Sequence, residues 1–454
     1  MGERHIKSIR ISGLFGLYSY VLPQQGEFSN ASILYGDNGV GKSTILRLVF
    51  HLLSPANKSG HRGALYKADF ENLEVLLSSD VIVSASKISE DEEIFLALQI
   101  SRGSKILATW RFKPGPSHAS YWETLIEIKS GRPRHYRKHK RNQPGETQVP
   151  EGENAFLSAL AQHAPVMFIL NADRRLDSDA VPDPSDEVEL RRALRMDEPK
   201  RINDLVVRSR EIALSQALAA AQKWIYRRAI QASNQGAMNV HGVYANILRH
   251  LQSSKNVGGG PTDIIGLQKR LTVIENRTSE LARYELQSPL SMAEFRRALS
   301  GRAKAKVSLA ADLLEPYVES IEARVEALDP IYRLVDRFVT IVNGLLSDKT
   351  LRFQLSQGFS IWNKLDSKLE AGQLSSGEQQ LLLLFSYVLT GRDSPSVFMI
   401  DEPEISLNIK WQRQLIQALL DITEGTTVQF IFASHSLELL AQHRQRVVKL
   451  TSVQ

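Results

Sequence analysis

No cysteine occurs among the 454 residues of this chain. Disulfide bonds, thiolate catalysis and cysteine-ligated zinc are therefore excluded. The sequence also has no apolar run of about 20 residues, the length that a membrane-spanning helix requires. Its first residues lack the apolar core of a signal peptide. We therefore expect a cytoplasmic protein without a membrane partner.

Neither sign of charge dominates, because 56 Lys and Arg residues stand against 50 Asp and Glu residues and leave a formal net charge of +6. With so small an excess, the places where charges gather matter more than their sum. The densest basic cluster is residues 132–141, which Gly and Pro flank, as is typical of a loop or hairpin tip. Two interpretations stay open: a solvated loop, or an anion-binding patch for nucleic acid or an acidic protein.

Residues 36–44 carry the pattern G-x-x-x-x-G-K-[ST], between a predicted strand at 31–35 and a predicted helix at 44–50. The pattern predicts a phosphate-binding P-loop. Its glycines let the backbone curl so that successive N–H groups point at phosphate. Its lysine places a charge beside the β- and γ-phosphates, and its serine hydroxyl serves Mg²⁺. The predicted nucleotide-binding residues of this loop are Gly36, Asn38, Gly39, Gly41, Lys42, Ser43 and Thr44.

A second apolar strand, predicted over residues 397–400, ends in two carboxylates, Asp401 and Glu402. We predict that Asp401 and Ser43 hold Mg²⁺. Glu402 is predicted to polarise the attacking water, and Lys42 to assist catalysis through its charge. The alternative is structural, because acidic residues that follow a strand often cap a helix.

The segment 374–379, Leu-Ser-Ser-Gly-Glu-Gln, precedes an apolar helix predicted from residue 380. A γ-phosphate is expected to bind at the N-terminus of that helix, where backbone N–H groups are free. The residues predicted to bind nucleotide there are Ser375, Ser376, Gly377 and Glu378. Taken alone, the segment also fits an ordinary serine-capped helix.

His435 follows a third apolar strand and is predicted to contact the γ-phosphate as a switch. With P-loop, signature segment, paired carboxylates and histidine in this order, the chain resembles the ABC ATPase class that includes the SMC, RecF and OLD families. The resemblance implies an α/β fold: an ABC-type P-loop NTPase head made of two sequence-separated lobes, with a helical, short coiled-coil-like insertion. It also implies ATP hydrolysis, with ATP and Mg²⁺ as cofactors.

The same resemblance implies a homo-oligomer, at least a dimer, in which two subunits sandwich each nucleotide. Lys42, Asp401 and Glu402 then belong to one subunit's nucleotide, and Ser375 and Gly377 reach it from the second subunit. ATP joins the two heads, and hydrolysis releases them.

A narrower resemblance rests on the run 401–408, which is close to the form found in OLD-like and related defence ATPases. Together with residues 12–16 and 409–412, it makes the chain similar to the ATPase subunit of the PARIS anti-phage system, with the Septu ATPase subunit second. These systems imply a separately encoded nuclease subunit, Toprim-like for PARIS and HNH-type for Septu. PARIS further implies release by an acidic phage trigger protein. Because the chain ends soon after His435, we expect no Toprim domain within it.

Two other functions stay open. One is a RecF-like DNA-repair ATPase that acts directly on DNA, with steeply salt-dependent binding. The other is a transporter ATPase subunit, which the long insertion between P-loop and signature disfavours. Ser376 stands where transporters carry a second glycine, and Asn408 stands where a D-loop Asp or His is usual. The position of Asn408 bears on coupling between the two sites of a dimer.

Three regions are predicted: an N-terminal ATPase lobe at 1–174, a helical insertion for dimerisation or partner docking at 175–345, and a C-terminal ATPase lobe at 346–454. The first lobe is expected to contain an antiparallel sheet over 65–170. The polar segment 175–188 is expected to be a linker.

Within the insertion, apolar residues recur in 3-4 alternation and predict a coiled-coil-like seam. The seam residues are Val318, Ile321, Val325, Leu328, Tyr332, Val335, Val339 and Val342. Pro330 falls inside this stripe and is expected to begin a second helix. The insertion is either a plain helical subdomain or an arm that docks a partner.

Overall fold

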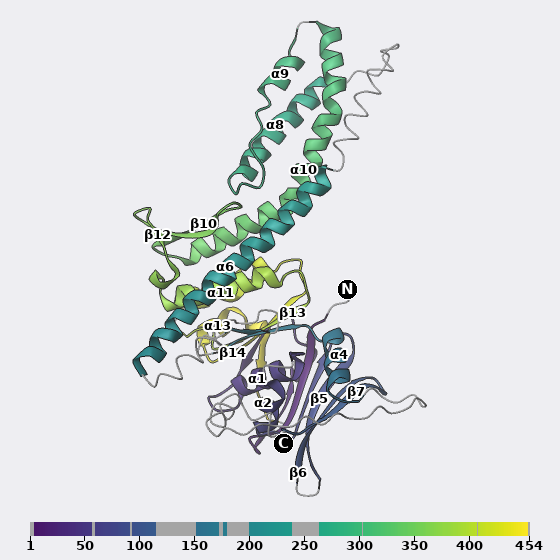
Figure 1. Cartoon of the computed structure of the whole chain (residues 1–454), viewed down its shortest axis with the longest axis vertical. Coiled ribbons are helices and arrows are strands. Elements are labelled where there is room, and N and C mark those ends of the chain that lie inside the picture. The colour runs from purple at the N-terminus through teal and green to yellow at the C-terminus, as the bar shows by residue number, and fades with distance from the viewer. Residues whose placement is uncertain are drawn as a thin grey trace, which may run out of the picture. The chain divides into compact units, whose positions relative to one another are not determined.

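A computed structural model describes residues 4–56, 60–90, 93–114, 151–171, 176–178, 199–237, 263–301, 303–405 and 407–452 (Figure 1). The basic cluster at 132–141 lies outside these residues. The chain divides into two compact units, one formed by Met1–Val188 with Gly391–Gln454 and the other by Glu189–Thr390. In the described part of the chain, no helix is long and apolar enough to cross a membrane.

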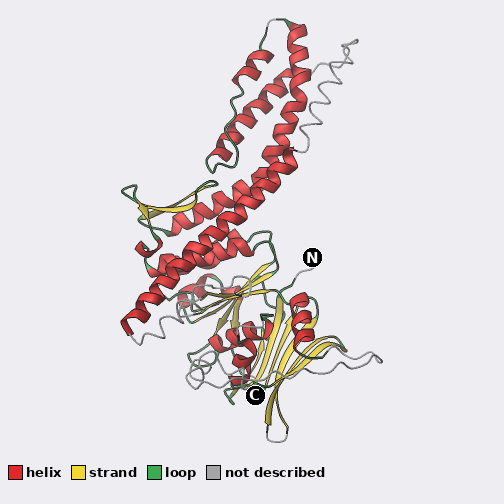
Figure 2. Ribbon diagram, in the orientation of Figure 1, coloured by secondary structure: helices red, strands yellow, loops and turns green. Residues whose placement is uncertain are grey.

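The first unit contains a six-stranded sheet in the order β15-β3-β14-β13-β8-β9. Figure 2 draws the strands of the chain in yellow and the helices in red. All neighbours pair in parallel except β8 and β9. β13 and β14 are buried at every position, as expected of parallel strands covered on both faces. The strands are β3 (Ala31–Tyr35), β8 (Val166–Leu170), β9 (Leu176–Ser178), β13 (Ser396–Asp401), β14 (Val428–Ser434) and β15 (Val447–Lys449).

A second six-stranded sheet of this unit is antiparallel, in the order β2-β1-β4-β5-β6-β7. Its strands are β1 (Ile6–Leu14), β2 (Tyr18–Leu22), β4 (Asn72–Leu77), β5 (Val81–Glu90), β6 (Glu93–Arg102) and β7 (Lys105–Phe112). α1 (Lys42–Leu53) contacts strands of both sheets, and its buried residues join one hydrophobic core with theirs. The predicted strand at 31–35 and the predicted P-loop helix are thus confirmed. The antiparallel sheet predicted over 65–170 is confirmed for residues 72–112, whereas residues 166–170 form β8 of the parallel sheet. The remaining helices of the unit are α2 (His61–Lys67), α4 (Glu153–His163), α12 (Ile409–Ile422), α13 (Leu437–Gln442) and the 3-10 helix η3 (Arg444–Arg446).

Gln429 of β14 ties the two sheets together through its side-chain amide. Its Oε1 accepts from the backbone N–H of Ile6 at 2.9 Å, and its Nε2 donates to the Ile6 carbonyl at 2.9 Å. The same Nε2 also donates to the carbonyl of Ser29 at 3.1 Å. Gln429 is only 2% exposed, so its substitution by an apolar residue leaves buried backbone groups without partners.

We expect Gln429→Leu to lower the free energy of unfolding by about 1–3 kcal/mol, the cost of buried unpaired polar groups. Urea unfolding followed by circular dichroism measures the change. Gln417→Leu is the matched control, because Gln417 is exposed on α12 and bonds to Asp421 of the same helix. Equal stability of the two variants would contradict the prediction.

The second unit is mainly helical and comprises α6 (Pro199–Ala237), α8 (Ile264–Ala282), α9 (Ala293–Leu299) and α10 (Lys304–Leu345). α10 packs against the other three (Figure 1). The predicted seam is confirmed as a stripe on α10: Val318 and Leu328 are fully buried, and Val335 is 1% exposed. Because this seam is buried against helices of the same chain, it forms the core of a helical subdomain.

Pro330 does not begin a second helix, so that prediction is wrong. α10 continues through both Pro316 and Pro330. An interior proline removes one hydrogen bond and costs about 3 kcal/mol. Burial of several seam residues on either side, at about 1.5–3 kcal/mol for each large apolar side chain, offsets that cost.

Two predicted boundaries differ from the observed division. The segment 175–188, expected to be a linker, contributes β9 to the parallel sheet. Residues 346–390, predicted to open the C-terminal ATPase lobe, belong to the helical unit. They first form a three-stranded sheet of β10 (Lys349–Gln354), β11 (Gly358–Asn363) and β12 (Lys368–Leu369), then η2 (Ala371–Gln373) and α11 (Ser376–Gly391). β10 and β11 thus form an antiparallel hairpin ahead of the signature segment.

Candidate ATP-binding and hydrolysis site

The P-loop connects β3 to α1 and has the backbone that its glycines predict. Gly39 and Gly41 have φ angles of 86° and 96°, which L side chains rarely adopt. A Cβ at Gly41 would also lie 2.6 Å from Leu14 Cδ2. Lys42 is 5% exposed, and its Nζ donates to the carbonyls of Gly36 at 2.8 Å and Asp37 at 3.0 Å. The ammonium is thus held inside the loop, where a phosphate group would meet it.

Ser43 and Asp401, the predicted magnesium ligands, lie in contact. Ser43 Oγ donates to Asp401 Oδ1 at 2.7 Å across 358 positions of sequence. Asp401 is 3% exposed at the end of β13, and burial raises its pKa although the bond from Ser43 opposes this. A hydroxyl and a buried carboxylate are hard oxygen donors, and a cation would relieve the cost of burying that charge. The two residues therefore fit Mg²⁺.

Glu402 follows β13 in a left-handed backbone conformation, with a φ angle of 48°. Such a conformation is strained for a residue other than glycine and recurs at functional sites. The N–H of Glu402 donates to the carbonyl of Ala433 at 2.8 Å, which anchors the strained residue to β14. Burial, followed by the adjacent Glu404 carboxylate, raises the pKa of Glu402 to about 7, while His435 opposes the shift. A carboxylate of this kind suits the acceptance of a proton near neutral pH.

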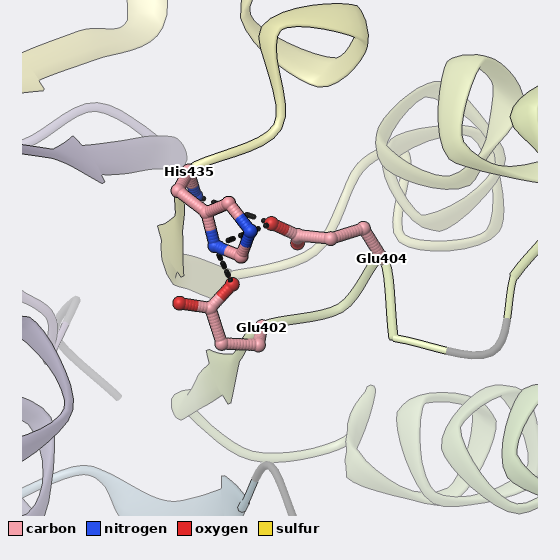
Figure 3. Close-up of side chains that lie close together, drawn as sticks. All are labelled: Glu402, Glu404 and His435. Carbon is pink, nitrogen blue, oxygen red and sulfur yellow. Dashed lines mark hydrogen bonds and ion pairs between the residues drawn. The ribbon is translucent and has the colours of Figure 1, made fainter. Parts of the chain in front are cut away.

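His435 and Glu404 complete the cluster around Glu402 (Figure 3). His435 Nδ1 lies 2.6 Å from Glu402 Oε2, so the imidazole orients the carboxylate. Glu404 Oε1 accepts three hydrogen bonds at the end of β14. The donors are Ser434 Oγ, on the last residue of the strand, at 2.7 Å, and the N–H groups of His435 and Ser436 in the loop that follows, at 3.1 Å each. Glu404 is 8% exposed and thus joins the two loops that carry Glu402 and His435.

One ligand atom each from Glu402, Glu404 and His435 lies within 4.8 Å of the others, a spacing that a metal ion also tolerates. The contacts among them favour a network of ion-pair contacts and hydrogen bonds instead. His435 Nδ1 is at hydrogen-bond distance from Glu402, and Glu404 Oε1 already serves three donors. The cluster therefore supplies proton-accepting and orienting groups beside the Ser43 and Asp401 pair.

We expect Glu404→Ala to reduce the free energy of unfolding by about 1–3 kcal/mol, because it removes the acceptor of the buried Ser434 hydroxyl and of the partly buried His435 N–H. The Ser436 N–H keeps a second acceptor, Ser434 Oγ at 3.0 Å. It should also lower kcat for ATP hydrolysis, since His435 loses the bond that fixes its backbone. Glu404→Gln keeps an acceptor oxygen and should restore most of both losses. Thermal unfolding and steady-state phosphate release measure the two effects. A Glu404→Ala protein with wild-type stability would show that Glu404 does not hold the loop.

The signature residues lie in the helical unit, at the start of α11. Ser375 and Glu378 form a reciprocal capping box: the N–H of Ser375 donates to Glu378 Oε2 at 2.7 Å, and the N–H of Glu378 donates to Ser375 Oγ at 3.4 Å. Ser375 and Ser376 are exposed, while Gly377 is buried. Glu378 is 8% exposed, so its carboxylate is occupied within the unit. The serine-capped helix is thus observed, and the predicted contact of this segment with nucleotide remains a prediction.

Of the predicted site residues, the structure brings together Lys42, Ser43, Asp401, Glu402 and His435 at the carboxyl ends of β3, β13 and β14. Ligands of open parallel sheets bind at that edge. Sequence reasoning missed Glu404 as a site residue, although it stands only two residues after Glu402, the predicted proton acceptor. Asn408 is the N-cap of α12, where its Oδ1 accepts from the N–H of Trp411 at 2.9 Å.

The strand order, the P-loop and the carboxylates at the end of β13 define an ABC-type P-loop NTPase fold of the α/β class. Residues 277–441 match the family described as "AAA domain, putative AbiEii toxin, Type IV TA system". The molybdenum import ATP-binding protein ModC of Escherichia coli is 32% identical over 83 residues, which are 18% of this chain and 23% of that protein. The ModC protein of Shigella flexneri matches to the same extent. The matched stretch thus spans about a quarter of the length of these curated relatives.

Solved structures of Smc head domains are also similar. The head with an extended coiled coil from Pyrococcus furiosus, bound to the C-terminal domain of ScpA, is 14% identical over 99% of this chain and 96% of that chain, with a TM-score of 0.35. The head with a coiled coil and joint from Pyrococcus yayanosii is 13% identical over 99% and 95%, with a TM-score of 0.37. With TM-scores this low, the fold assignment rests on the sheet topology and the P-loop.

Proposed function

We propose that this chain binds and hydrolyses ATP with Mg²⁺, and that the signature loop of a second copy closes each nucleotide site. One observation carries the proposal: Lys42, Ser43, Asp401, Glu402 and His435 meet at one edge of the parallel sheet. Together they offer a phosphate cradle, a pair of magnesium ligands and an oriented proton acceptor. That combination matches what phosphoryl transfer to water requires.

Binding depends on the P-loop. The positive-φ glycines 39 and 41 shape a loop whose N–H groups can face phosphate, and α1 begins directly after it. Lys42 exchanges the carbonyls of Gly36 and Asp37 for phosphate oxygens. Ser43 and Asp401 would hold Mg²⁺, and the bound ion would neutralise part of the negative charge on the phosphates.

Hydrolysis depends on Glu402 and its neighbours. Glu402 orients a water molecule and accepts its proton. His435 holds the Glu402 carboxylate through Nδ1, and Glu404 fixes the backbone of His435. The second subunit supplies its Ser375 and the first N–H groups of its α11 to this nucleotide. Each site is therefore complete only in the dimer. ATP binding then favours the closed dimer and hydrolysis releases it.

More narrowly, we propose a regulatory role in bacterial anti-phage defence, in which this ATPase acts as the sensor or scaffold of a complex and controls a separately encoded nuclease. The run Asp-Glu-Pro-Glu-Ile-Ser at 401–406 supports this role through its similarity to defence ATPases. The family that matches residues 277–441 supports it further, because its description includes a toxin and a toxin–antitoxin system. In the proposed complex, the ATPase would likewise hold a toxic nuclease inactive until a trigger arrives.

The test is affinity purification of a tagged Glu402→Gln protein, co-expressed with its genomic neighbours and kept in Mg-ATP. Recovery of a Toprim-like or HNH-type nuclease in stable proportion is the expected result. Recovery of the ATPase alone, together with ATP-dependent retention of DNA, would reject the defence role and favour a RecF-like repair ATPase. A Lys42→Ala protein in the same purification separates nucleotide-dependent partners from adventitious ones.

A further inference from the structure

A buried ion pair joins the start of β10 to the signature loop. Lys349 Nζ lies 2.6 Å from Glu378 Oε2, and the two side chains are only 20% and 10% exposed. The same Oε2 accepts from the N–H of Ser375 at 2.7 Å. One carboxylate oxygen therefore bridges a lysine of β10 and Ser375 of the signature segment.

The charge on Glu378 is maintained in this environment. Burial opposes ionisation, but the Lys349 ammonium and the Ser375 N–H prevail and hold the pKa of Glu378 below its ordinary value. An ionised carboxylate forms stronger hydrogen bonds than a neutral acceptor does. The capping box of α11 consequently depends on a cation supplied by another element.

Contacts with α10 and with the residues that follow α8 hold β10, the strand that carries Lys349, in position. Asn343, near the end of α10, pairs with both backbone groups of Leu351: its Oδ1 accepts from the N–H at 2.7 Å, and its Nδ2 donates to the carbonyl at 3.0 Å. The N–H of Leu355, just after β10, donates to the carbonyl of Tyr284 beyond α8 at 3.1 Å. β10 is therefore fixed at both ends by the helical part of the unit.

We propose that Lys349 is a positioning residue for ATP hydrolysis, which acts through Glu378 to hold the signature loop in the conformation that closes the second subunit's nucleotide site. The inference rests on the proposed composite site. It also gives Glu378 a role in holding the loop, in place of the direct nucleotide contact predicted from the sequence. Ser375 and Ser376 remain exposed at the start of α11 and free to face that nucleotide.

The test compares Lys349→Met with Lys349→Arg and with the double variant Lys349→Met/Glu378→Gln. Lys349→Met should lower kcat and weaken the ATP-dependent dimer by about tenfold, the effect of losing one charge-assisted hydrogen bond. Its Kd for mant-ATP with Mg²⁺, measured on the monomer at low protein concentration, should stay at the wild-type value, because the P-loop lies in the other unit. Lys349→Arg should restore part of the loss. The double variant should have a higher kcat and a tighter ATP-dependent dimer than Lys349→Met, because it leaves no buried charge without a partner.

Arg352→Met is the matched control, because Arg352 lies on the same strand and pairs with Asp366 at an exposed site, 49% and 71% exposed. It should behave as wild type. Wild-type kcat and dimerisation in Lys349→Met would overturn the inference alone. A loss of mant-ATP affinity equal to the loss of kcat would also overturn it, since that result means general damage. A wild-type protein with no ATP-dependent dimer would overturn the composite site and this inference together.

Discussion

Glu402→Gln should lower kcat for ATP hydrolysis by about 10²–10⁴-fold, the contribution of a positioned proton acceptor. The amide keeps the shape of the side chain but cannot accept the proton of water. The groups proposed to bind nucleotide and magnesium are Lys42, Ser43 and Asp401, and their observed contacts do not involve Glu402. Mg-ATP affinity should therefore stay within about twofold of wild type, because only the catalytic step is impaired.

This separation has a consequence for assembly. If ATP closes the dimer and hydrolysis opens it, Glu402→Gln should accumulate as an ATP-bound dimer that size-exclusion chromatography with light scattering resolves from the monomer. Glu438→Gln is the matched control, because Glu438 forms an exposed ion pair with Arg413. Wild-type turnover in Glu402→Gln would remove Glu402 from the mechanism. Low turnover with no dimer would argue that the site is completed within one chain.

The sequence predicted the parts of the site that local backbone geometry determines. The spacing of glycine, lysine and serine in the P-loop specifies a turn and a helix start, which the structure shows, and Ser43 contacts Asp401 as the predicted magnesium pair requires. The contacts of Lys42 and Ser43 with nucleotide stay a prediction. The carboxyl ends of buried parallel strands meet at one edge, which is why Glu402 and His435 also meet there. For these residues, the sequence motif and the sheet topology both predict a position at the same edge of the sheet.

The parts that the sequence did not predict depend on partners far along the chain. Glu404 bonds to residues about 30 positions away, and Lys349 reaches Glu378 across 29 positions. No periodicity encodes such pairs. Pro330 shows the reverse case: its local preference to begin a helix was overridden by the burial of the α10 seam on both sides. Tertiary packing outweighs a local preference of a few kcal/mol.

Lys42→Ala should weaken the binding of Mg-ATP by about 10²-fold or more, because it removes charge-assisted hydrogen bonds to the phosphates. Lys42 is the P-loop residue whose ammonium already lies 2.8 Å from Gly36 O and 3.0 Å from Asp37 O, inside the loop that would hold the phosphates. With binding lost, hydrolysis and ATP-dependent dimerisation should be lost as well. This pattern differs from that of Glu402→Gln, in which binding persists.

Titration with mant-ATP and Mg²⁺ measures the change in Kd, and thermal unfolding without nucleotide checks the fold. Lys113→Ala is the matched control, because Lys113 forms an exposed ion pair with Glu93 and has no part in the P-loop. The carbonyls of Gly36 and Asp37 border exposed loop positions, so water can replace the lost ammonium and the apo protein should keep its stability. A Kd within twofold of wild type would mean that this P-loop does not hold the phosphates of ATP. A melting temperature that falls in parallel with affinity would instead make Lys42 a structural residue of the loop.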